Sequence, residues 1–176
     1  MKTVLNEQQL SITIKRLAHQ VLENHINLKD TVLIGIQPRG IFVSDQLIRE
    51  LSNLLPGQQI NYGKLDITFY RDDVAKVIHI PNHTEISFSI ENKNVVLIDD
   101  VLYTGRTIRA ALDALMTFGR PAKVELCVLI DRRFSRQLPI QPDYVGRAID
   151  SIISQKVKVY WKERDNRQEV VLLEGL

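Results

Sequence analysis

The sequence has little cysteine and no long hydrophobic run. Its single cysteine, Cys127, excludes a disulfide framework. Because Cys127 lies within an apolar run, we expect a small core side chain in a reducing compartment. No stretch approaches the roughly 20 apolar residues that a membrane-spanning helix requires, and the chain reaches Asn6 without the apolar segment of a signal peptide. We therefore expect a cytoplasmic protein with no membrane partner.

An excess of charge of one sign is also missing. Lys and Arg number 23 and Asp and Glu number 21, so the formal net charge is +2. This balance permits nucleic-acid binding without implying it. With 44% hydrophobic residues, the chain is neither disordered nor collagen-like. Its 176 residues predict a single domain.

Hydrophobic periodicity predicts helices that alternate with strands. Apolar residues at helical spacing predict three amphipathic helices, over residues 10–22, 47–55 and 108–118. Asn6 and Gln9 have the spacing of a capping box ahead of the first helix. Unbroken apolar runs predict three buried parallel strands, over residues 32–36, 95–98 and 124–130. The order of these elements predicts an α/β fold with a mostly parallel central sheet flanked by helices.

Two segments extend this pattern. Residues 58–70 alternate, with Leu65, Ile67 and Phe69 on one side, which predicts a half-exposed strand. The polar residues 71–92 that follow lack periodicity, and we expect a flexible lid loop there. Residues 156–174 predict a C-terminal hairpin. We expect the strand and the hairpin at the edges of the central sheet.

Residues 95–107 carry the chemistry. The strand 95–98 delivers two carboxylates, Asp99 and Asp100, to the start of a loop at its carboxyl end, where open α/β sheets bind ligands. Residues 104–107 then offer two hydroxyls, a glycine and the N–H groups of a helix N-terminus, which suit a phosphate. Carboxylates beside a phosphate site fit a ligand with hydroxyls or a metal, such as a sugar phosphate. The alternative is that the acids only cap the helix that follows. Because a single side chain is enough to cap a helix, this alternative explains one of the two acids and not the other.

Other phosphate motifs are absent. The sequence contains neither Asp-x-Asp-x-Thr nor the Gly-x-x-x-x-Gly-Lys-Ser/Thr loop. Residues 95–107 instead resemble the phosphoribosyl-pyrophosphate motif of the type I phosphoribosyltransferases. Four segments further resemble the PyrR family, at residues 65–73, 100–107, 119–121, and 138–140 with 143–144. The members of that family are uracil phosphoribosyltransferases that double as RNA attenuators of pyrimidine operons, and the similarity runs from about residue 6 to residue 149.

The resemblance implies synthesis of UMP and pyrophosphate from uracil and phosphoribosyl pyrophosphate, with magnesium (Mg2+). It implies that Asp99 and Asp100 hold the ribose hydroxyls, directly or through magnesium, and that Arg71 acts from the lid. Arg39 would supply charge to the pyrophosphate and Gly40 a close backbone approach. The implied phosphoribosyl-pyrophosphate site comprises Pro38, Arg39, Gly40, Asp99, Asp100, Val101, Leu102, Tyr103, Thr104, Gly105, Arg106 and Thr107. Related enzymes often have a cis peptide bond in the loop that receives pyrophosphate, which corresponds to Gln37–Gly40 in this sequence. The bond in question would be Pro38–Arg39, and a sequence cannot show its geometry.

The resemblance leaves open which nucleobase accepts the phosphoribosyl group. Residues 128–132 and 142–146 also resemble hypoxanthine-guanine phosphoribosyltransferases, which form the leading enzymatic alternative. Those enzymes usually have an aspartate at the position of Tyr103, so uracil is favoured here. The expected base-binding residues are Asp131, Arg132, Tyr144, Val145 and Gly146. For Tyr144, a packed core aromatic fits equally well.

The resemblance also implies an RNA partner. Arg16 and His19 of the first helix and Arg136 match positions of the PyrR attenuators, whereas Gln141 replaces a family arginine and Lys15 an expected threonine. A polar helix face is otherwise simply solvated. The implied partners are phosphoribosyl pyrophosphate, uracil, UMP, a leader mRNA and further copies of the chain in a homodimer or higher homo-oligomer. A protein that is mainly an RNA attenuator with residual enzyme activity is the second alternative.

Overall fold

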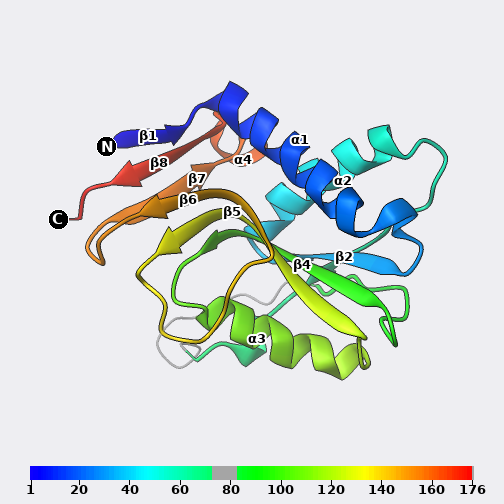
Figure 1. The fold of residues 1–176 in the computed structure, drawn as a ribbon. Coiled ribbons are helices and arrows are strands. Elements are labelled where there is room, and N and C mark those ends of the chain that lie inside the picture. The colour runs from blue at the N-terminus through cyan, green and yellow to red at the C-terminus, as the bar shows by residue number, and fades with distance from the viewer. Residues whose placement is uncertain (73–82, 176) are drawn as a thin grey trace.

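The computed structural model describes residues 1–72 and 83–175. The strands are β1 Lys2–Leu5, β2 Thr31–Ile36, β3 Asn61–Leu65, β4 Asn94–Leu102, β5 Lys123–Arg133, β6 Tyr144–Asp150, β7 Lys156–Tyr160 and β8 Glu169–Leu173. The helices are α1 Glu7–Asn24, α2 Gly40–Leu54, α3 Arg106–Leu115 and α4 Lys162–Asp165. Five strands form a parallel sheet in the order β3-β2-β4-β5-β6. Helices α1 and α2 cover one face of this sheet and α3 covers the other (Figure 1), which confirms the predicted α/β fold.

Local sequence explains most of these elements. The predicted capping box starts α1, since the Asn6 side chain accepts from the Gln9 N–H and the Gln9 side chain accepts from the Asn6 N–H. Strand β2 is buried at every position, as expected for a strand with helices on both sides. None of the helices in the described parts of the chain is long and apolar enough to cross a membrane.

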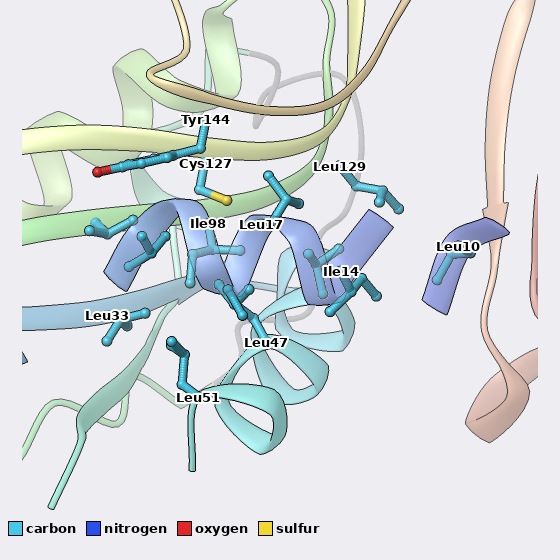
Figure 2. Packing of buried hydrophobic residues seen from close by; sticks show 14 of the residues in the cluster. Leu10, Ile14, Leu17, Leu33, Leu47, Leu51, Ile98, Cys127, Leu129 and Tyr144 are labelled. Carbon is cyan, nitrogen blue, oxygen red and sulfur yellow. The ribbon is translucent and has the colours of Figure 1, made fainter. Parts of the chain in front are cut away.

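The core has one layer on each face of the parallel sheet. Figure 2 shows part of the layer beneath α1 and α2, where Leu17, Leu47 and Ile98 meet. Cys127 and Tyr144 lie in the same layer, and burial raises the pKa of the Cys127 thiol to about 12. The predicted role of Cys127 as a small core side chain is therefore confirmed.

The central sheet differs from its prediction in two places. Strand β4 does not end at Ile98, because its pairing with β5 continues from Asp99 to Leu102. Both acids therefore belong to the strand and not to the loop. Strand β6 was not predicted, since its sequence mixes a glycine and charged residues with apolar ones, as an edge strand tolerates.

The two added segments also differ from expectation. Strand β3 is an edge strand but stops at Leu65, and a short 3-10 turn follows in which Phe69 is 77% exposed. Phe69 thus does not share the buried side of Leu65 and Ile67. The hairpin β7–β8 is present, but it pairs with β1 in a separate three-stranded antiparallel sheet and does not extend the central one. Of the expected lid, residues 73–82 lie outside the described residues.

Candidate active site

A pocket of about 290 Å³ lies where β4 ends and α3 begins. Its walls are formed by Arg71, Asp72, Asp99 and residues 101–108. The carboxyl end of a strand and the N-terminus of a helix meet there, as in other ligand sites of open α/β sheets. The structure thus brings together the motif that the sequence singled out.

The two acids have different surroundings. Asp99 lines the pocket, and its Oδ1 accepts the Asp100 N–H at 2.9 Å. Burial raises the pKa of Asp99 well above its usual range, and the neighbouring Asp100 adds to the effect. Asp100 is equally buried, but its Oδ2 accepts from Arg39 Nε at 2.9 Å, which partly offsets the rise in its pKa caused by burial. Adjacent residues of a strand point to opposite faces, which explains why only one acid lines the pocket.

The phosphate loop is shaped by Gly105. Its φ of 91° lies in the left-handed region, and a Cβ there would come within 3.0 Å of the Ile140 side chain. Helix α3 begins at the next residue, so the N–H groups of its first turn lie at the pocket. The Thr104 carbonyl accepts from the N–H groups of Gln137 at 3.0 Å and Leu138 at 3.2 Å, which fixes the loop from behind. This arrangement suits an anion.

Residues 37–40, expected to receive pyrophosphate, do not line this pocket. Arg39 donates to Asp100 and, through Nη2, to the Val159 carbonyl at 2.7 Å, so it connects β4 to the small sheet. A Cβ on Gly40 would lie 2.5 Å from the Ile98 carbonyl. Close helix–strand packing therefore requires this glycine, whose Cβ would also lie 3.1 Å from Asp99 Oδ1. The cis peptide bond of this loop is Gln37–Pro38, whereas the resemblance to related enzymes suggested Pro38–Arg39.

A second cluster adjoins Tyr103. The Arg132 guanidinium lies 3.9 Å from the centroid of the Tyr103 ring. Arg136 donates to the Tyr103 carbonyl at 2.6 Å and pairs with Asp131. Asp131 and Arg132, two of the expected base-binding residues, thus lie beside the pocket wall. Arg132 also binds the Ser151 hydroxyl at 2.8 Å.

Sequence reasoning missed the connection between β6 and β7. Arg132 ties this segment down by donating to the carbonyls of Ile152 at 3.1 Å and Gln155 at 3.0 Å. Ile152 and Ile153 are exposed there, next to Phe134. The only signal in the sequence for this segment is the pair of adjacent isoleucines, Ile152 and Ile153.

The other three expected base-binding residues lie elsewhere. Tyr144 packs in the core (Figure 2). Its hydroxyl donates to Glu125 at 2.7 Å and accepts from Asn24 at 3.1 Å. The Val145 and Gly146 carbonyls accept from Arg16. Since Tyr144 pairs with Cys127 while Asp131 pairs with Ala148, the start of β6 is four positions away from Asp131 along the sheet. The structure therefore does not bring residues 144–146 to the pocket beside Asp131.

The residues expected to bind RNA also separate. Arg16 and His19 lie exposed on α1, and the Arg16 guanidinium reaches the start of β6. Arg136 is half-buried in the wall beside Tyr103 and is engaged by Asp131. The structure therefore does not offer Arg136 as a cation that projects into solvent.

Fold and site together define a phosphoribosyltransferase, and the phosphoribosyl transferase domain family matches residues 1–164. Among solved structures, this chain is similar to a hypoxanthine phosphoribosyltransferase from Staphylococcus aureus, with a TM-score of 0.71 and 21% identity over 100% of this chain and 92% of the other. A hypoxanthine phosphoribosyl transferase from Trypanosoma cruzi gives a TM-score of 0.75 and 20% identity over 99% and 91%. These likenesses show the fold.

Sequence relatives are more specific. "Bifunctional protein PyrR" from Mannheimia succiniciproducens is 48% identical over 98% of each chain. The protein of the same name from Desulfosudis oleivorans is 45% identical over 96% of this chain and 94% of its own. The chain belongs to the PyrR family. At the level of the family, this confirms the prediction of a uracil phosphoribosyltransferase that also regulates pyrimidine genes.

Proposed function

We propose that this chain, acting as one domain, transfers the phosphoribosyl group of phosphoribosyl pyrophosphate to uracil. The observation that carries the proposal is the pocket in which buried Asp99 faces the phosphate loop at the N-terminus of α3. The second activity is UMP-dependent binding of a leader mRNA. Action in the cytoplasm and assembly into a homodimer or higher homo-oligomer remain predictions.

In this proposal the sugar phosphate occupies the pocket. The N–H groups and hydroxyls of residues 104–107 hold the 5-phosphate, and Asp99 accepts from the ribose hydroxyls. Donors at Asp99 favour its ionised form, which burial alone disfavours. Arg71, which lines the same pocket, supplies positive charge toward the pyrophosphate. The bond from the anomeric carbon to pyrophosphate breaks, the bond from that carbon to a uracil nitrogen forms, and the proton of that nitrogen passes to the departing pyrophosphate.

The donor set suits magnesium. Within the described residues, no group of three or more His, Cys, Asp or Glu side chains forms a cage for a metal. Mg2+ is commonly held by one or two carboxylates together with substrate oxygens, and the buried carboxylate of Asp99, which lines the pocket, would be such a ligand, whereas Asp100 accepts from Arg39. When bound, the ion would neutralise charge on the leaving pyrophosphate.

We place the base beside Tyr103, Asp131 and Arg132. The Tyr103 ring, covered by Arg132, forms part of the pocket wall and provides no carboxylate for the proton transfer expected with purines. Purified protein should be assayed with phosphoribosyl pyrophosphate against uracil, hypoxanthine, guanine and orotate. We expect uracil to be used best. A clear preference for hypoxanthine would make the chain a purine enzyme and would refute the proposal.

The RNA activity is carried by the exposed cations of α1. Arg16→Ala should weaken UMP-dependent binding of a structured leader RNA. Because one phosphate contact is lost, the slope of the logarithm of the binding constant against the logarithm of the salt concentration should become shallower by about one. Because Arg16 also binds β6 carbonyls, the melting temperature is measured alongside. Lys29→Ala, which removes an exposed lysine just beyond α1, is the control for charge. If the protein binds every RNA with the same weak affinity and UMP has no effect, the RNA-binding activity is refuted and only the transferase activity remains of the proposal.

A further inference from the structure

Two arginines of α3 fasten the chain segment Tyr70–Asp72. Asp72 Oδ2 accepts from Arg106 Nη1 at 2.9 Å, and Asp72 Oδ1 accepts from Arg109 Nη2 at 2.5 Å. Arg109 Nη2 also lies 3.3 Å from the Tyr70 carbonyl, which accepts from it. Arg109 therefore holds the residue before Arg71 and the residue after it.

Stability alone does not account for this arrangement. The side chains of Asp72, Arg106 and Arg109 are 43%, 54% and 40% exposed, and exposed ion pairs contribute little to folding. The contacts fix the position of the backbone, because the Tyr70 carbonyl and the Asp72 carboxylate are held on the two sides of Arg71. The segment is the edge of the pocket, since Arg71 and Asp72 line it together with Asp99.

The charge of Arg71 acts at that pocket. Arg71 lines the pocket together with Asp99, so its positive charge lies at the proposed phosphoribosyl site. Coulombic interactions weaken with distance, so the size of this influence depends on where the backbone of Arg71 is held. Arg109, by contrast, does not line the pocket.

We propose that Asp72 and Arg109 form a positioning pair that holds Arg71 at the phosphoribosyl site. The proposal rests on the transferase function proposed above. It assigns Asp72 and Arg109 no contact with the reacting atoms. Their effect on catalysis should therefore pass entirely through Arg71.

The test is a double-mutant cycle. Asp72→Asn and Arg109→Gln should each lower kcat/KM for phosphoribosyl pyrophosphate about tenfold, and neither should lower it further in an Arg71→Ala background. If Asp72→Asn remains equally costly in that background, Asp72 acts independently of Arg71, for example through Arg106, and the proposal is overturned. Unchanged kcat/KM in either single variant also overturns it.

A matched control comes from the same helix. Asp113 accepts from Arg109 Nη1 at 2.9 Å, one helical turn along α3. Asp113→Asn should leave kcat/KM within about twofold of the parent, and a loss equal to that of Asp72→Asn would overturn the proposal.

Calorimetric titration of phosphoribosyl pyrophosphate without uracil gives a readout separate from turnover. We expect the same cycle in affinity, with about tenfold weaker binding in Asp72→Asn and no further loss when Arg71→Ala is already present. If the affinities of the parent and the variants follow this cycle but the parent does not convert uracil, the proposed function fails and the positioning pair stands. Additive losses of affinity would contradict the pair even in an active enzyme.

Discussion

Glu125 provides a test of how the fold is held together at the end of the sheet away from the pocket. Its side chain is 6% exposed at the start of β5. His25 Nε2 lies 2.6 Å from its Oε2, Lys123 Nζ lies 2.6 Å from its Oε1, and Tyr144 donates to it at 2.7 Å. Burial by itself would raise the pKa of Glu125, but these partners outweigh burial and lower it to about 2.

The lowered pKa corresponds to a stabilisation of the folded state. Each tenfold change in proton affinity is worth about 1.4 kcal/mol, so lowering the pKa from 4.5 to about 2 corresponds to about 3 kcal/mol. Because the folded-state value lies below the unfolded one, this contribution is complete above about pH 5. It falls as the pH drops toward 2, and about half should remain at pH 3.

Urea unfolding of the parent protein and Glu125→Gln at several pH values measures this contribution. We expect the free energies of unfolding to differ by about 3 kcal/mol at pH 7 and by about half as much at pH 3. Glu23→Gln removes an exposed carboxylate from α1 and controls for the change in net charge. A difference between parent and Glu125→Gln that stays constant from pH 7 to pH 3 would refute the reasoning.

Three further predictions follow from the placement of single residues. Tyr144→Phe should lower the free energy of unfolding by about 1–3 kcal/mol, because it leaves a buried carboxylate with one donor fewer. It should leave the KM for uracil unchanged, and a large rise in KM would restore Tyr144 to the base site. Asp99→Asn should lower kcat at least about tenfold, or about 1.4 kcal/mol, with little change in melting temperature because the amide oxygen can still accept the Asp100 N–H, and unchanged turnover would remove Asp99 from the site. Gly40→Ala should destabilise the protein by about 1–3 kcal/mol in thermal unfolding, since its Cβ would lie 2.5 Å from the Ile98 carbonyl, and an unchanged melting temperature would contradict that contact.

Some features of the fold were predictable because their cause is local. A capping box needs only Asn6 and Gln9, which are three residues apart. A strand buried on both faces shows as an unbroken apolar run, as in β2. The candidate site was predictable for the same reason, since residues 99–107 are continuous and supply both Asp99 and the phosphate loop to one pocket.

The sequence by itself therefore determined the three main helices, the buried strands and the continuous part of the site, and the tertiary structure decided which distant groups meet. Arg16 binds the Gly146 carbonyl across 130 positions, and Arg39 binds the Val159 carbonyl across 120. A sequence pattern reports the periodicity and local conformation of one segment, but not which polar groups of a remote segment it will meet. Tyr144 became a core residue and Arg39 a link to the small sheet because buried polar groups take the hydrogen-bond partners that the folded chain brings to them.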